Sequence, residues 1–272
     1  MRYRHIINLL WVSLPVCVLL RVMQLNFTID QSTGFVEQQY SQICLLITFV
    51  VCAAIAAVSF MSFALEDVKK SEKATKPLVA IASVFTGGMF FFEVVTSAAD
   101  VKDFVIKELL LLILGLLSAV TFVAFGIKNI YNYNFPNGML AIPVIYYVVK
   151  LITLFVNTSS LALVTENVFL LFANSALLWF IYEFASFENK INESQRRQKS
   201  MLAIAIAAIM LSTVAVLPRL ILAILQKSDI AKGDVSSALL MLAQALFVLA
   251  YINGNYAKNN DANKRAISKH SA

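Results

Sequence analysis

Residues 201–225 read MLAIAIAAIMLSTVAVLPRLILAIL, a stretch in which Arg219 is the only charged side chain. A helix needs roughly 20 mostly apolar residues to cross the hydrocarbon core of a bilayer. Lipid offers no hydrogen-bond partner to backbone N–H and C=O groups, so an apolar run of this length must be helical to satisfy them. The stretch therefore predicts a transmembrane helix.

Seven more runs of this kind occur along the 272-residue chain. The composition agrees with a membrane protein, because 60% of the residues are hydrophobic and 14% are charged, whereas about a quarter are charged in an ordinary soluble domain. The sequence thus predicts an all-α, polytopic transmembrane helical bundle of about eight spans. The additional runs lie at about residues 6–25, 41–65, 77–98, 105–127, 139–157, 165–185 and 236–256.

Little chain remains for anything other than the membrane part. Eight crossings of about 20 residues use roughly 160 positions, and the remainder divides into short loops and a polar end. We expect one transmembrane helical domain over residues 1–256, followed by a polar cytoplasmic tail over residues 257–272. No soluble domain fits into what is left.

The basic residues accumulate on alternate connections between the predicted spans. Connections that face the cytoplasm carry an excess of Lys and Arg. The side with more basic residues is therefore predicted to be cytoplasmic, and both termini are predicted to lie on that side. We expect the protein to lie in the cell membrane. The poorer side holds four basic residues, Lys102, Lys107, Lys227 and Lys232. The richer side holds fifteen: Arg2, Arg4, Lys69, Lys70, Lys73, Lys76, Lys128, Lys190, Arg196, Arg197, Lys199, Lys258, Lys264, Arg265 and Lys269.

The net charge of +6 follows from this bias and does not predict nucleic-acid binding. The basic residues are scattered in short loops beside acidic neighbours such as Glu66, Asp67 and Glu193. Contact with anionic headgroups is the ordinary consequence of such loops. Membrane lipids are therefore the expected partners.

Signatures of catalysis and of cofactor binding are missing from the sequence. His5 and His270 are the only histidines and lie near opposite ends of the chain, which excludes a zinc site of the HExxH kind. No span combines a serine nucleophile with a histidine base, and no phosphate-binding or dinucleotide-binding glycine motif occurs. We expect a protein that is not an enzyme and that has no cofactor and no metal site.

Small residues mark where the helices can approach one another closely. Ser83 and Gly87 are four positions apart, as are Ala53 and Ala57. Small residues at this spacing let two transmembrane helices pack with their backbones close together. We interpret these pairs as ordinary packing positions.

The polar side chains inside the spans are the most informative about function. A charge near the centre of the bilayer costs about 2.5–3.5 kcal/mol on insertion scales, so such groups must pair or line a wet cavity. Four charged residues lie roughly one to two turns from the predicted outer ends of their spans: Arg21, Glu93, Lys150 and Arg219. Gln244 and Asn174 lie at a depth similar to that of these four residues or somewhat deeper.

Two interpretations of these side chains remain open. They can form an outward-facing basic pocket for an anionic or zwitterionic small molecule or a lipid headgroup, in which Glu93 neutralises one base. Alternatively, the bases snorkel to the outer interface and Glu93 forms a structural pair with one of them; for Arg21, nearest the surface, snorkelling is the favoured interpretation. The first interpretation predicts five ligand-binding residues: Arg21, Glu93, Lys150, Arg219 and Gln244.

Two functional classes follow. The first is a transporter or a small-molecule or lipid-binding membrane protein, which predicts that Lys150 and Arg219 face the interior of the bundle with a cavity between them. The second is a non-catalytic accessory or sensory membrane subunit that binds partner helices. It predicts a dry interior and stripes of small or aromatic residues that face outward.

Overall fold

A computed structural model gives the arrangement of the helices. It describes residues 3–28, 37–64, 77–100, 106–131, 135–136, 138–158, 164–189, 194–225 and 235–256. These residues form eight α-helices, two short 3-10 turns at Gln38–Tyr40 and Ser62–Ala64, and no strand. The helices are α1 (Tyr3–Phe27), α2 (Ser41–Met61), α3 (Pro77–Asp100), α4 (Ile106–Tyr131), α5 (Ala141–Thr158), α6 (Val164–Glu188), α7 (Gln195–Ile224) and α8 (Val235–Tyr256).

Seven of these described helices are long and apolar enough to cross a membrane. The exception is α5, whose apolar part is the shorter segment Ala141–Val156. At 1.5 Å per residue the whole of α5, Ala141–Thr158, is about 27 Å long, against about 30 Å for the hydrocarbon core. The predicted all-α polytopic bundle is confirmed as a multi-pass architecture.

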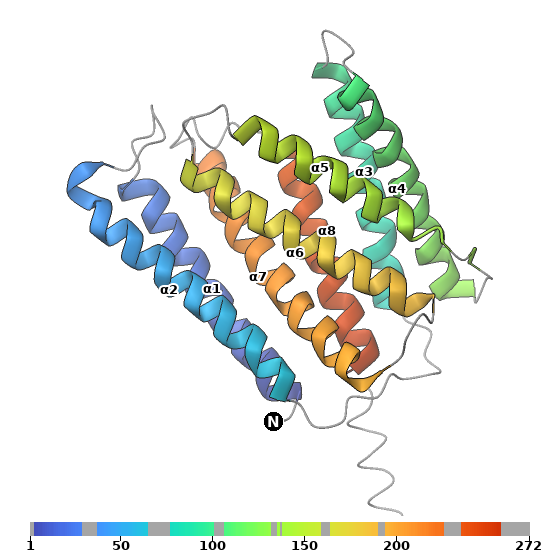
Figure 1. Cartoon of the computed structure of the whole chain (residues 1–272), viewed down its shortest axis with the longest axis horizontal. Helices are drawn as coiled ribbons and strands as arrows, with labels where there is room; N and C mark the ends of the chain where they lie inside the picture. The colour runs from blue at the N-terminus through green and yellow to red at the C-terminus, as the bar shows by residue number, and fades with distance from the viewer. Residues whose placement is uncertain are drawn as a thin grey trace, which may run out of the picture.

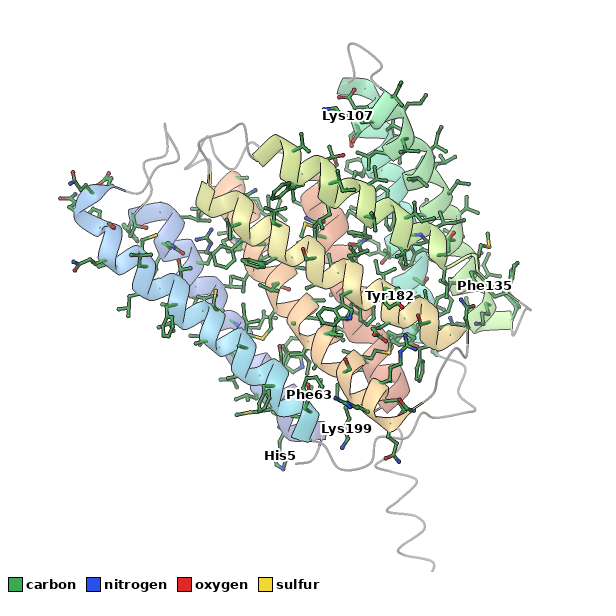
Figure 2. The ribbon with its side chains drawn as sticks, in the orientation of Figure 1. His5, Phe63, Lys107, Phe135, Tyr182 and Lys199 are labelled. Carbon is green, nitrogen blue, oxygen red and sulfur yellow. The ribbon has the colours of Figure 1, made fainter. Side chains whose placement is uncertain are left out.

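The helices alternate in direction through the bundle (Figure 1). His5 near the start of α1, Phe63 after α2 and Lys199 near the start of α7 lie at the lower end of the view, and Lys107 at the start of α4 lies at the upper end (Figure 2). Because α5 also alternates, α1 begins and α8 ends at the same lower end (Figure 1). This arrangement agrees with an even number of crossings, while the side of the membrane that this end faces stays a prediction.

Three groups of helices make up the bundle. The hairpin of α1 and α2 lies at one edge and the hairpin of α3 and α4 lies at the opposite edge (Figure 1). Between them, α7 packs against α1, α2, α6 and α8, and α8 packs against α3. Most of the α7 surface is therefore covered by protein, and α7 contributes buried residues along its whole length.

The α3–α4 hairpin is held by a close backbone approach. A Cβ added to Gly87 would lie 2.8 Å from the carbonyl oxygen of Ala119, and one added to Gly126 would lie 2.9 Å from that of Ala80. Ser83 donates a 2.6 Å hydrogen bond to a backbone carbonyl of α4. The expectation of close packing at Ser83 and Gly87 is confirmed, and any larger side chain at either glycine would push the two helices apart.

An aromatic cluster fills the interior toward the lower end. Its rings come from α3, α4, α6 and α8 and meet mostly edge to face, the geometry that aromatic pairs favour. Phe247 is at its centre, with its ring centroid 5.2 Å from that of Phe122 and 5.4 Å from that of Phe184. We define the aromatic cluster as Phe90, Phe122, Phe125, Phe180, Phe184, Phe247 and Tyr251.

Candidate functional site

A buried ion pair between α3 and α5 is the centre of the candidate site. Lys150 Nζ lies 2.6 Å from Glu93 Oε1, and the hydroxyl of Tyr146 donates a 2.5 Å hydrogen bond to Glu93 Oε2. Lys150 also donates a 2.9 Å hydrogen bond to Ser237 Oγ of α8. Both carboxylate oxygens are therefore satisfied, and the pair ties three helices together.

Local helix geometry explains how α5 supplies two of these groups. Tyr146 and Lys150 are four residues apart, so they stand one above the other on the same face of α5. Lys150 Nζ lies 3.4 Å from the Tyr146 hydroxyl oxygen, and 5.6 Å from the centroid of its ring. The spacing of these two residues places a cation and a phenol donor on the same carboxylate.

A second polar contact lies deeper in the same interface. The hydroxyl of Tyr147 is hydrogen bonded to Gln244 Oε1, which joins α5 to α8 again. Gln244 is 1% exposed, and its Nε2 has no hydrogen-bond partner among the residues that the structure describes. The ring centroids of Tyr146 and Tyr147 are 5.4 Å apart, so the two polar contacts are neighbours. We define the polar cluster as Glu93, Tyr146, Tyr147, Lys150, Ser237 and Gln244.

The ion pair removes the electrostatic cost of its own two charges. The side chains of Glu93 and Lys150 are 9% and 15% exposed. An isolated charge at such a position is costly in a membrane, but opposite charges bound to each other and to hydroxyl groups compensate. Glu93 pairs with Lys150, as both interpretations of the sequence expect, and this part of the candidate site carries no net charge.

Arg21 lies in a different interface and does not snorkel. It is 1% exposed, between α1 and α6. Its Nη1 donates a 2.5 Å hydrogen bond to Gln24 Oε1, and its guanidinium carbon lies 4.2 Å from the ring centroid of Phe169. Gln24 in turn donates a 2.9 Å hydrogen bond to Thr48 of α2. The expected snorkelling is wrong because an amide oxygen and an aromatic face stabilise the guanidinium inside the protein.

The other polar residues singled out in the spans lie on α6 and α7. Arg219 is partly buried in the last two turns of α7, directly after the buried Pro218. Asn174 is buried on α6, where its Nδ2 donates a 2.8 Å hydrogen bond to the carbonyl oxygen of Leu170. Of the five predicted site residues, the described contacts bring Glu93 and Lys150 directly together.

The sequence analysis did not single out Tyr146, Tyr147 and Ser237. Two spacings carried the signal: Tyr146 precedes Lys150 by four residues, and Ser237 precedes Gln244 by seven. Residues at such spacings share one face of a helix. A search for polar residues that share a helix face with Lys150 or with Gln244 would have found all three, because Tyr147 also precedes Lys150 by three residues.

Ion pairs of a different kind lie at the lower end. Lys128 of α4 lies 3.2 Å from Glu188 of α6, and Tyr251 of α8 donates a 2.8 Å hydrogen bond to the same carboxylate. Arg197 of α7 lies 2.7 Å from Glu183 of α6. Together with the aromatic cluster, these contacts join the lower ends of α4, α6, α7 and α8.

Within the described ranges, no group of three His, Cys, Asp or Glu side chains is arranged to hold a metal ion. No protein-family model, curated protein or solved structure matches this chain. The geometry of the polar cluster is therefore the basis on which a function is proposed.

Proposed function

We propose that this protein is a non-catalytic, multi-pass protein of the cell membrane that binds and transports a small anionic or zwitterionic molecule. The observation that carries the proposal is the buried Glu93–Lys150 pair, which α3 and α5 supply and which hydroxyl groups of α5 and α8 complete. Intramembrane ion pairs of this kind commonly lie on substrate or ion pathways. The ligand is either a soluble molecule or the headgroup of a lipid.

The closed pair favours a zwitterionic ligand. A ligand carboxylate or phosphate would take the place of Glu93 beside Lys150, and a ligand ammonium would take the place of Lys150 beside Glu93. One ion pair is then exchanged for two, and no charge is left uncompensated in the interior. A purely anionic ligand would leave the Glu93 carboxylate without its cation, which is a costly state for a buried group.

The distribution of contacts supports a site that opens at the upper end. The polar cluster joins α5 to α3 and α8 through a few side chains, so a small movement of α5 would release the ion pair. Below it, the aromatic cluster and the Lys128–Glu188 pair fill the space between the helices. The upper end is the extracellular end if the bias of basic residues has the usual sense.

The second candidate function is that of an accessory or sensory subunit that binds partner helices. The exposed apolar face of α2 favours it, because Phe49 and Phe60 are 71% and 75% exposed. A partner helix and lipid acyl chains would cover such a face equally well. The first proposal is preferred because it gives the buried ion pair a role beyond joining three helices.

Ligand-dependent stabilisation tests the proposal. The protein in lipid nanodiscs is heated with amino acids, carboxylates, phosphate esters and soluble phospholipid headgroups, and the nanodisc lipid is varied in a parallel series. We expect at least one compound or lipid to raise the unfolding temperature of the wild type and of Lys128→Met, but not of the double variant Glu93→Leu/Lys150→Met. Stabilisation by soluble compounds indicates a soluble ligand, and stabilisation by one nanodisc lipid alone indicates a headgroup. Equal responses of all three proteins, or no response at all, would reject a ligand site at this pair.

The proposed orientation has its own test. Ser32 and Ser268 lie outside the described residues, in the first predicted outer connection and in the tail. In a cysteine-free background, the thiol of Ser32→Cys should react with an impermeant reagent added outside intact cells. The thiol of Ser268→Cys should react only after permeabilisation. Reaction of both thiols from the same side would contradict the topology.

A further inference from the structure

The side-chain amide nitrogen of Gln244 is buried and donates no hydrogen bond to any residue that the structure describes. Its Oε1 is bonded to Tyr147, its side chain is 1% exposed, and its Nε2 has no hydrogen-bond partner among the described residues. A buried donor without a partner loses its hydration and gains nothing in exchange, so folded proteins rarely keep one. Asn174 Oδ1, Gln198 Oε1 and Ser212 Oγ are also without a partner among the described residues, but Gln244 alone of the four belongs to the polar cluster, so an acceptor bound at that cluster is its expected partner.

The Gln244 side chain lies on the same face of α8 as Ser237, which contacts the ion pair. Ser237, Met241 and Gln244 follow one another on one face of α8, at spacings of four and three residues. Ser237 binds Lys150, and Gln244 binds Tyr147, which is three residues before Lys150 on α5. The α5–α8 interface therefore carries polar groups from Ser237 to Gln244, over about 10 Å along α8.

Immediately below Gln244 the interface becomes apolar. Phe247, one turn further along α8, packs edge to face on Phe122. Phe90 of α3 also stacks on Phe122, with ring centroids 5.5 Å apart, but it lies beside the polar cluster, where its ring contacts those of Tyr146 and Tyr147. At the level of Gln244, Thr86 of α3 donates a 3.2 Å hydrogen bond to the carbonyl oxygen of Ala243. Gln244 is thus the last polar side chain before a closed aromatic floor.

We infer that Gln244 is the inner end of the ligand site and that its Nε2 donates to an acceptor oxygen of the ligand. The inference rests on the proposed function, and it narrows the ligand to an elongated zwitterion. Its charged end binds at Glu93 and Lys150, and a carbonyl, hydroxyl or ester oxygen lies about 10 Å from that end. A compact zwitterion would fill the outer part of the site and leave the amide of Gln244 unused.

Chemical accessibility along α8 tests this inference. The native Cys17, Cys44 and Cys52 are first replaced by Ala, Ser and Ala, since Cys44 accepts a hydrogen bond from Gln24. Single cysteines are then introduced as Ser237→Cys and Gln244→Cys. The probe is an anionic, membrane-impermeant methanethiosulfonate. The thiolate of the introduced cysteine attacks it, which forms a mixed disulfide and releases methanesulfinate. It is added from the outside to the protein in intact cells or in sealed vesicles of the same orientation.

The matched control is Val248→Cys, which lies one turn below Gln244 on the same face and is 1% exposed. We expect Ser237→Cys and Gln244→Cys to react, each about tenfold or more faster than Val248→Cys, because a thiol ionises readily only where water reaches it. If Gln244→Cys does not fold, Met241→Cys replaces it, with the same expectation.

The outcomes separate this inference from the proposed function. Reaction at Ser237→Cys without reaction at Gln244→Cys or Met241→Cys overturns the extended site but leaves the ion-pair site standing. No reaction at any position overturns both. Reaction at Val248→Cys as fast as at Gln244→Cys shows that the floor is open, and it overturns Gln244 as the inner end.

Discussion

The two ends of α8 are stabilised in different ways. In its first half, Ser237 and Gln244 contact α5 through hydrogen bonds, and one amide nitrogen is left over. In its second half, Phe247 and Tyr251 contact α4 and α6 mainly through aromatic rings. The same helix thus separates a polar, exchangeable interface from an apolar, closed one.

This difference indicates where the molecule can open. Ring contacts depend on close packing over a large area. Moving one ring therefore leaves a cavity, which lowers the stability of the folded protein. An ion pair can be replaced by the charges of a ligand at much lower cost. Lipid already surrounds the bundle with apolar material, so packing rather than removal of apolar surface from water holds the aromatic half together.

The largest effect is expected from Lys150→Met. The substitution leaves the Glu93 carboxylate buried without its cation, which should lower the free energy of unfolding by about 3–5 kcal/mol. Unfolding of the protein by SDS in mixed micelles measures the loss. The control is Glu93→Leu/Lys150→Met, which removes both charges and should recover most of the stability while abolishing ligand binding. A single variant as stable as the wild type would show that the Glu93 carboxylate does not depend on Lys150.

The second largest loss of stability is expected from Phe247→Ala, which should disturb only the contacts of the second half of α8. Its ring contacts Phe122, Phe125, Phe184 and Tyr251, and its removal leaves a cavity that should lower stability by about 3 kcal/mol. The same unfolding measurement detects it, and the lipid-facing Leu246→Ala is the control on the same helix. Ligand-dependent stabilisation should persist. Loss of the ligand response in a folded Phe247→Ala protein would show that the two halves are not separate.

Glu93→Gln should be milder than Lys150→Met. The Lys150 side chain is 15% exposed, against 9% for Glu93, and Ser237 still accepts one of its hydrogen bonds. A surplus base can reach water more easily than a surplus carboxylate, so the expected loss is about 1–2 kcal/mol. Both variants are compared in one denaturation series. The reverse order of stability would show that Lys150 depends on Glu93 more than Glu93 depends on Lys150.

Lys128→Met should have the smallest effect. The Lys128 side chain is 29% exposed and Glu188 keeps its hydrogen bond from Tyr251, so a loss of about 1 kcal/mol or less is expected. Its unfolding midpoint should move little, and ligand binding should be unchanged. A loss as large as that of Lys150→Met would give the lower ion pair an importance equal to that of the upper one.

Much of the fold could be predicted from the sequence. The apolar runs fixed the number of helices and their approximate bounds, because backbone groups in lipid have no other way to pair. The spacing of Ser83 and Gly87 predicted the close approach of α3 to another helix, which is α4. The fifth helix also agrees with its prediction, since the apolar run at 139–157 forms α5 at Ala141–Thr158.

The candidate site could be predicted only in part. Sequence gave the residue types and their depth, and these were sufficient to expect a pairing of Glu93 with a base. It could not tell which base, because Glu93 and Lys150 are 57 residues apart and Lys150 and Ser237 are 87 apart. For Arg21, depth alone suggested snorkelling, whereas Phe169 of α6 covers the guanidinium.

The class of protein thus follows from the amino-acid sequence alone: an all-α bundle of apolar helices with polar groups buried at a few positions. The packing of the helices then brings Lys150 rather than Arg21 to Glu93, and it leaves an amide nitrogen of Gln244 without a partner among the described residues. The reason is physical. Apolar runs specify that a helix forms and how long it is, but its rotation and tilt depend on side-chain packing with every neighbour. A rotation of one helix by a single residue moves a side chain by about 100° and separates an ion pair.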